Sequence, residues 1–171
     1  DFRKPLICFT PKKLLRYPSC VSSVKDFTTG GFREVIDDAT ATVKSVKKVV
    51  FCSGKIYYDL IEAKAKNAAD DIAVVRMEQL YPFPIMQIKM ILDKYKGATE
   101  YIWAQEEPEN MGAWAFVMRM FTKYPETENI KLKYIGRAEN ASPATGFSKS
   151  HAEQQQAIVD KVVTAKQLVT K

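Results

Sequence analysis

The chain has 171 residues, a length that suits one domain with a hydrophobic core. Hydrophobic residues make up 46% and charged residues 27%, as in an ordinary globular protein, and no apolar run reaches the roughly 18–20 residues of a membrane-spanning helix. The net charge of +6 is uneven, because residues 1–50 carry ten Lys and Arg against five Asp and Glu. This basic third could meet a phosphate-bearing cofactor or an acidic protein face, or it could be a solvated lysine-rich surface. No nucleic-acid-binding signature is present.

Five short β-branched and aromatic runs predict strands, at residues 6–10, 49–52, 72–75, 101–104 and 132–135. The last four begin 23, 29 and 31 residues apart, which is about the length of a strand–helix–strand unit. Their apolar residues are continuous rather than alternating, as in parallel strands that are covered on both faces.

Apolar stripes with helical spacing follow these runs, at residues 56–63, 85–95, 114–124 and 158–169. The last helix is expected to open with a capping box from Ser150 to Glu153. Residues 37–46 are small and polar and read as a variable loop. The predicted fold is therefore an α/β three-layer sandwich with a mostly parallel sheet of about five strands.

The three cysteines are odd in number and follow no metal or disulfide pattern. Cys8 and Cys52 lie inside apolar runs, so we interpret both as small core residues. This usage fits a reducing compartment.

The carboxyl ends of the predicted strands are polar and charged. If the sheet is parallel, these ends gather at one edge, where open α/β sheets bind ligands. The edge then carries three cations and three anions, namely Lys55, Arg76 and Arg137 with Glu78, Glu106 and Glu107. It could be an ion-pair network that stabilises the edge or contacts another domain, or it could be an anion-binding mouth.

No complete catalytic group emerges from the sequence. Ser53-Gly54-Lys55 is not a Walker loop, because Ile56 follows the lysine. His151 is the only histidine, so every triad would need it, and we expect it at a surface or interface. Adjacent residues of a strand point to opposite faces, so Glu106 and Glu107 would diverge rather than act as an acid/base pair. We expect no metal site, because one histidine and no CxxC motif leave only carboxylates.

Five blocks occur in order: FTPKKLLRYP (9–18), CSGKIYYDL (52–60), AVVRMEQLYPFP (73–84), QEEPENMGAW (105–114) and YIGRAENASPATGFSKSHAEQQ (134–155). Each resembles the matching block in the C-terminal domain of the E1 component of the 2-oxoglutarate dehydrogenase complex. The resemblance spans essentially the whole chain. More broadly, the pattern is similar to the last, Rossmann-like domain of transketolase-like enzymes.

The resemblance implies a larger enzyme, of which residues 1–171 form a single C-terminal domain. Such enzymes are homodimers that use thiamine diphosphate and magnesium to decarboxylate 2-oxoglutarate in the citric acid cycle. They transfer the succinyl group to the lipoyl arm of the dihydrolipoyl succinyltransferase component. The cofactors belong to the preceding domains, so we expect none in this chain and no activity from it alone. We expect a cytoplasmic enzyme in a bacterium, a mitochondrial-matrix enzyme in a eukaryote, and contact with neither membrane nor nucleic acid.

Some relatives bind acetyl-CoA as an activator in this domain. A CoA site needs cations for its phosphates, and Arg137 matches the family's arginine position. The residues expected at such an acetyl-CoA or anion site are Thr10, Lys25, Arg33, Lys55 and Arg137. Ala138 stands where responsive relatives carry a second arginine, which removes a bidentate phosphate contact and favours a structural role for these residues.

Arg76, Glu78, Glu106, Glu107 and His151 are then expected at an ion-paired domain interface. Two alternatives remain open. One is an E1 that acts on another 2-oxo acid, and the other is a separate CoA- or nucleotide-binding regulatory module.

Overall fold

The computed structural model describes residues 2–164. The chain divides into two compact units, residues 1–32 and residues 33–171, which are described separately here. The prediction that residues 1–171 form one domain of a larger enzyme stays a prediction.

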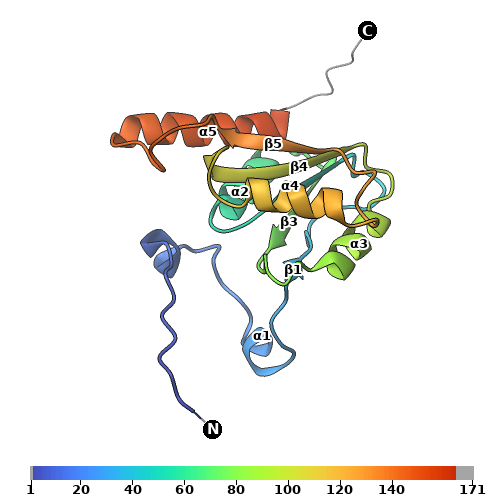
Figure 1. The fold of residues 1–171 in the computed structure, drawn as a ribbon, viewed down its shortest axis with the longest axis horizontal. Helices are drawn as coiled ribbons and strands as arrows, with labels where there is room; N and C mark the ends of the chain where they lie inside the picture. The colour runs from blue at the N-terminus through green and yellow to red at the C-terminus, as the bar shows by residue number, and fades with distance from the viewer. Residues whose placement is uncertain (1, 165–171) are drawn as a thin grey trace. The chain divides into compact units, whose positions relative to one another are not determined.

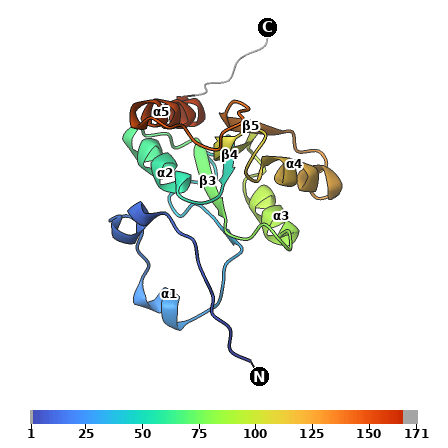
Figure 2. The same cartoon turned by 60° about the vertical axis from the view of Figure 1, so that its left-hand side comes forward.

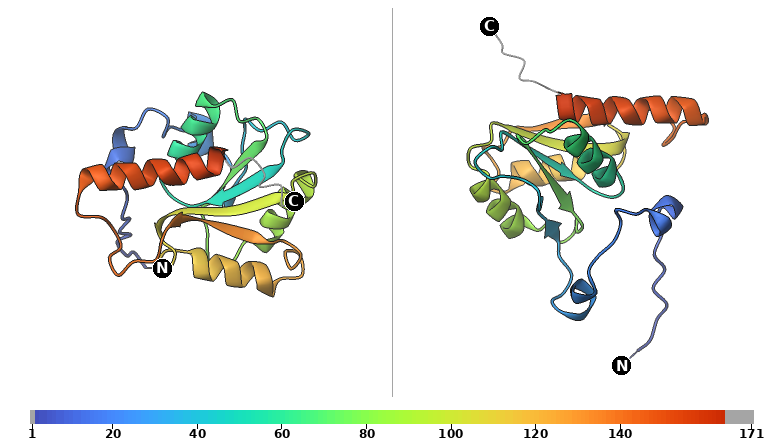
Figure 3. Two further views of the ribbon diagram at one scale, coloured as in Figure 1. Left: turned by 90° about the horizontal axis from the view of Figure 1, so that it is seen from above. Right: turned by 180° about the vertical axis from the view of Figure 1, so that it is seen from behind.

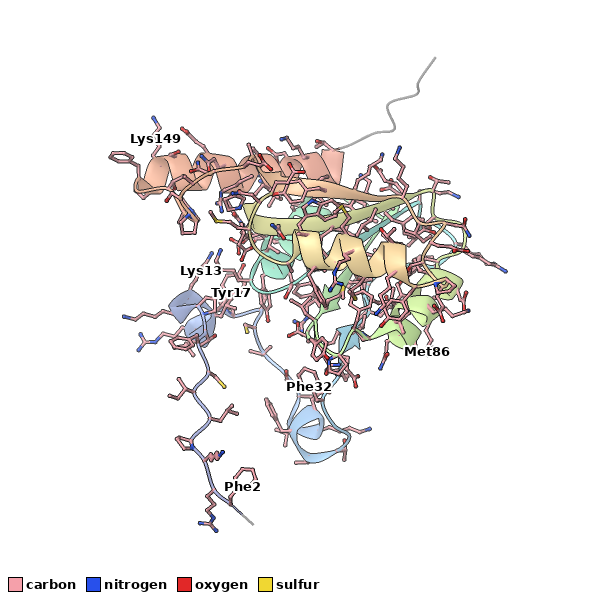
Figure 4. All side chains as sticks on the ribbon, viewed as in Figure 1. Phe2, Lys13, Tyr17, Phe32, Met86 and Lys149 are labelled. Carbon is pink, nitrogen blue, oxygen red and sulfur yellow. The ribbon has the colours of Figure 1, made fainter. Side chains whose placement is uncertain are left out.

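The first unit contains two short helices. They are η1 (Lys12–Arg16), a 3-10 helix, and α1 (Val24–Thr28), which begins with a capping box between Ser23 and Asp26. The strand predicted at residues 6–10 is wrong, because this run forms no ladder and Phe9 is 99% exposed. Cys8 is likewise exposed rather than in a core, whereas Cys52 is buried as predicted. Figure 4 shows this unit with its side chains.

The second unit is built on a five-stranded sheet in the order β1-β3-β2-β4-β5 (Figure 1). The four strands β2 (Lys48–Cys52), β3 (Ile72–Met77), β4 (Glu100–Pro108) and β5 (Leu132–Arg137) are parallel. The two-residue strand β1 (Val35–Ile36), which the sequence analysis missed, pairs antiparallel with β3. β4 and β5 run side by side in the view from above in Figure 3. The predicted mostly parallel sheet is confirmed.

Helices cover both faces of the sheet, as Figure 2 shows. One face is covered by α2 (Ile56–Lys66) and α5 (Ser148–Thr164), and the other by α3 (Ile85–Lys94) and α4 (Trp114–Lys123). Successive residues of β2 divide between the two cores: Val49 and Phe51 face α3 and α4, whereas Val50 and Cys52 face α2 and α5. Burial on both faces explains the continuous apolar runs.

The helical stripes are confirmed where the structure describes them. Leu60, Ile88, Val117 and Ile158 are all buried. The end of the last stripe, at residues 165 to 169, lies outside the described residues. The expected capping box of the last helix is wrong, because α5 already begins at Ser148 and Ser150 is therefore inside it.

Candidate functional site

The carboxyl ends of β2, β3, β4 and β5 meet at one edge of the sheet, as their parallel pairing requires. β2 and β4 are neighbours, yet β2 continues into α2 on one face and β4 into α4 on the other. This is a topological switch point, where a crevice opens beyond the strand ends. We call the last residues of these four strands, together with the residues that directly follow them, the carboxyl edge.

An ion pair between Lys55 and Glu106 crosses the switch point. Lys55 precedes α2, and Glu106 lies near the end of β4. The side chains are 32% and 16% exposed, so both charges are partly shielded from water. The sequence suggested Arg76, Arg137 or a neighbouring domain as the partner of Glu106 and Glu107, but within residues 2–164 the cation paired with the Glu106 carboxylate is Lys55.

Glu107 belongs to the other face of β4, together with Trp103 and Gln105. All three side chains line a cavity of about 480 Å³ at the switch point, on the side of α4. Glu106 and Glu107 therefore diverge, because successive residues of a strand alternate between faces. No ion pair or hydrogen bond of the Glu107 carboxylate is found within residues 2–164.

Gln105 connects β4 with the turn that leads into α4. Its Oε1 accepts hydrogen bonds from Trp103 Nε1 at 2.8 Å and from the Trp114 backbone N–H at 3.0 Å. Its Nε2 donates to the carbonyl of Met111 at 2.8 Å, and the residue as a whole is 3% exposed. This role of Gln105 was not predicted from the sequence, although an uncharged amide at the end of an apolar run was a usable signal.

The turn closes at Gly112, which has a φ of +67°. A Cβ there would lie 3.0 Å from both the Gln105 amide and the Glu107 Cβ. The position therefore requires glycine for its conformation and for its space.

Arg137, at the end of β5, joins this strand to β4 and α5. It donates to the Glu106 carbonyl and, at 3.2 Å, to Gln155 Oε1 on α5, and its Nη2 lies 3.3 Å from His151 Nδ1. Gln155 in turn donates to Asp59 on α2 at 2.8 Å. These contacts fasten α5 to the carboxyl edge and occupy much of the guanidinium, although the Nε atom is buried with no hydrogen-bond partner among the described residues.

Arg76 pairs with Glu78 at 3.1 Å, and its guanidinium lies 4.6 Å from the centroid of the Tyr57 ring. Burial raises the pKa of Tyr57 and also raises the pKa of the Cys52 thiol, to about 12, with the Arg76 charge opposing both effects. Cys52 therefore remains a thiol near neutral pH and supplies no thiolate nucleophile.

The residues of the predicted acetyl-CoA or anion site fall in both units. Thr10 and Lys25 belong to residues 1–32, whereas Arg33, Lys55 and Arg137 belong to the sheet-containing unit. Within the latter, Lys55 and Arg137 both bind Glu106, one through its carboxylate and the other through its carbonyl. The anion site stays a prediction, as does the predicted domain interface.

A buried ion pair escaped the sequence analysis. Lys64 on α2 donates to Asp38 at 2.7 Å, and these residues are 6% and 3% exposed. Asp38 also accepts from the backbone N–H of Val74 and from the N–H and hydroxyl of Thr40. Burial raises the pKa of Asp38, but these hydrogen bonds outweigh it and hold the pKa below 3.8. Asp38 lies in the stretch that read as a variable loop.

Within residues 2–164, no group of three or more His, Cys, Asp or Glu side chains is arranged to hold a metal ion. Every helix in the same range is too short or too polar to traverse a bilayer.

Comparison with known proteins gives the family. The model of the family "2-oxoglutarate dehydrogenase C-terminal" matches residues 21–163. The 2-oxoglutarate dehydrogenase E1 component of Cupriavidus necator is 46% identical over 160 residues, which are 93% of this chain and 17% of the relative. The mitochondrial 2-oxoglutarate dehydrogenase of Caenorhabditis elegans is 44% identical over 166 residues, 94% of this chain and 16% of the relative.

The chain is also similar in sequence to an E1 component that is named after a different 2-oxo acid. The 2-oxoadipate dehydrogenase complex component E1 of Xenopus laevis is 43% identical over 167 residues, 96% of this chain and 18% of the relative. The chain thus spans about a sixth of the length of these curated relatives. The match over most of the chain confirms the resemblance seen in its five sequence blocks, and the chain belongs to the 2-oxoglutarate dehydrogenase C-terminal family.

Proposed function

We propose that this chain is the C-terminal domain of a 2-oxoglutarate dehydrogenase E1. The whole enzyme decarboxylates 2-oxoglutarate and passes the succinyl group to the lipoyl arm of its partner acyltransferase. The observation that carries this proposal is the family match over residues 21–163, supported by the relatives named 2-oxoglutarate dehydrogenase.

The domain's own role in this proposal is structural. Lys55 is paired with Glu106, and Arg137 is bonded to β4 and α5, so these charges hold the carboxyl edge together. Glu106 and Glu107 diverge, so these two carboxylates do not form an acid/base pair in one cavity. A domain of this kind supports its neighbours and supplies no reacting group.

Thiamine diphosphate and magnesium belong to the proposed whole enzyme and not to this chain. The described residues do not fit these groups, because residues 2–164 offer no cluster of metal-binding side chains and the chain has no GDG motif for a magnesium-bound diphosphate. The proposal therefore assigns the cofactors to the rest of the enzyme.

The partners follow from the same proposal. They are the remaining domains of the E1 chain, a second E1 chain in a homodimer, and the dihydrolipoyl succinyltransferase component. The relatives include bacterial and mitochondrial proteins, so the proposed location is the cytoplasm in a bacterium and the mitochondrial matrix in a eukaryote.

Decarboxylation assays test the proposal. The 171-residue chain, supplied with thiamine diphosphate and magnesium, should release no carbon dioxide from 2-oxoglutarate. A full-length relative should be active, and the same relative without the matching segment should lose stability or assembly together with activity. Turnover by the chain alone, or undiminished activity of the shortened relative, would contradict the proposal.

Acetyl-CoA regulation is a finer proposal for the same domain, with Thr10, Lys25, Arg33, Lys55 and Arg137 as its residues. Calorimetric titration of the chain with acetyl-CoA and with AMP checks it. Binding that is lost in Arg137→Ala would support the effector site. If no binding heat is measured at millimolar concentrations of either ligand, only the structural role of these residues remains.

A further inference from the structure

The cavity at the switch point is distinct from the ion pairs of the carboxyl edge. Its volume of about 480 Å³ lies within the range of small-molecule pockets. It opens where open α/β sheets bind ligands, between the ends of neighbouring strands whose helices leave to opposite faces. Its lining includes three aromatic residues, namely Tyr81 from the loop before α3, Trp103 from β4 and Phe116 from α4.

The cavity is built on fixed parts. Trp103 is fully buried, and its indole N–H is held by Gln105. Gln105 also holds the turn before α4 through Met111 and Trp114, so this turn is tied to β4. Phe116 packs edge-to-face on Phe83, with 6.1 Å between ring centroids. These contacts favour a site that is formed before a ligand arrives.

The cavity carries one negative charge, on Glu107. Within residues 2–164 this carboxylate has no cation and no hydrogen-bond donor beside it. The nearby Lys55 is already paired with Glu106 on the opposite face of β4. An anionic ligand would therefore be repelled by Glu107, whereas a cation would gain an ion pair.

From this geometry we infer that the switch-point cavity binds a planar organic cation, a guanidinium or amidinium group on a flat or apolar body. The delocalised head matches the carboxylate of Glu107 in a two-pronged hydrogen bond. The accessible rings of Tyr81 and Phe116 offer faces and edges to a flat cation, and such cations are attracted to aromatic faces. The polar groups at the rim, such as the Ser53 hydroxyl, can bond the remaining donors.

Benzamidinium, a flat aromatic cation, is a suitable probe, with neutral benzamide as its isosteric control. Titration of the ¹⁵N-labelled 171-residue chain should shift the Trp103 indole resonance and the Gly54 and Gly112 amides. The expected Kd is about 1 mM, given the small size of the probe. Benzamide should bind about 10-fold more weakly, because it lacks the charge-assisted hydrogen bonds.

Two variants test whether the Glu107 carboxylate is the charge that binds the cation. Glu107→Gln keeps the shape of the side chain and should weaken benzamidinium about 10-fold. Glu109→Gln removes an exposed carboxylate two positions further along the chain, outside this cavity, and should leave the Kd within about 2-fold. Equal binding of benzamide and benzamidinium, an unchanged Kd in Glu107→Gln, or no shift at the Trp103 indole would overturn the inference.

A guanidinium ligand could be a free small molecule or an arginine side chain from elsewhere in a longer enzyme. The same titration of a full-length relative with the same cavity residues separates these sources. Persistent binding identifies a free cation as the ligand, whereas protection of the site identifies a side chain of the enzyme. Either result supports the inference only if the 171-residue chain binds benzamidinium more tightly than neutral benzamide.

Discussion

Lys55 and Glu106 form an ion pair between the carboxyl ends of two neighbouring strands, β2 and β4, whose following helices lie on opposite faces of the sheet. The pair spans the crevice at the switch point from the α2 face. The adjacent Glu107 points to the α4 face and lines a cavity there. Two consecutive glutamates thus have different surroundings, and substitutions at them should differ accordingly.

Glu106→Gln should lower the free energy of unfolding by about 1–2 kcal/mol, because it leaves the partly shielded Lys55 without its anion. Glu107→Gln should change it by less than about 0.5 kcal/mol, since that carboxylate is exposed. Urea unfolding of both variants measures the difference. A double-mutant cycle with Lys55→Met gives the coupling energy of the pair. Equal losses in the two glutamine variants would refute the distinction.

Lys64→Met should lower the free energy of unfolding more than most substitutions of a charged residue in this chain. It leaves the buried Asp38 carboxylate without its cation, and breaking a buried pair in this way costs about 3–5 kcal/mol. Lys66→Met, on the exposed side of the same helix, is the matched control and should cost less than about 0.5 kcal/mol. Thermal and urea unfolding compare the two, and similar stabilities would contradict the importance of the pair.

Asp38 should also make stability depend on pH in acid. Its pKa in the folded protein is held below the ordinary 3.8, so the unfolded chain binds the proton more readily. The stabilising contribution is complete above pH 3.8 and is lost as the pH falls below that value through the folded-state pKa. The free energy of unfolding of the wild type should fall more steeply in this window than that of Asp38→Asn. Parallel slopes would rule out this source of acid sensitivity.

Gln105→Leu should cost about 3 kcal/mol or more. The leucine fills a similar volume but leaves the indole N–H of Trp103, the backbone N–H of Trp114 and the carbonyl of Met111 without their partner. Gln156→Leu, on the exposed side of α5, is the control and should be nearly neutral. Chemical denaturation gives the energies, and near-UV circular dichroism reports the tryptophan environment. A neutral Gln105→Leu would show that the turn is held by other contacts.

Gly112→Ala and Gly54→Ala form a matched pair, because both glycines have positive φ values, +67° and +76°. Each alanine should cost about 1 kcal/mol for its left-handed conformation. Gly112→Ala should cost about 1 kcal/mol more, since its Cβ would press on Gln105 and Glu107, whereas the space beside Gly54 is open. Measured stabilities in the reverse order would disprove this account.

Much of the sheet could be predicted from local pattern alone. The runs at residues 49–52, 72–75 and 101–104 are continuously apolar because helices cover both faces of those strands. The same rule failed at residues 6–10, where an equally apolar run has no neighbouring strand and stays exposed. A short apolar run indicates that a segment is suited to burial, but it does not indicate which strand or helix would bury it.

The sequence by itself determined the α/β class, the order of the parallel strands and helices along the chain, and the family, because these depend on periodicity and on motifs within single segments. Only the tertiary structure decided that Lys55 pairs with Glu106, that Lys64 and Asp38 are buried together, and that Gln105 holds the turn into α4. These contacts join residues of different elements or depend on how a turn closes. Their energies come from burial and geometry, which follow from the strand order β1-β3-β2-β4-β5 and not from any one stretch of sequence.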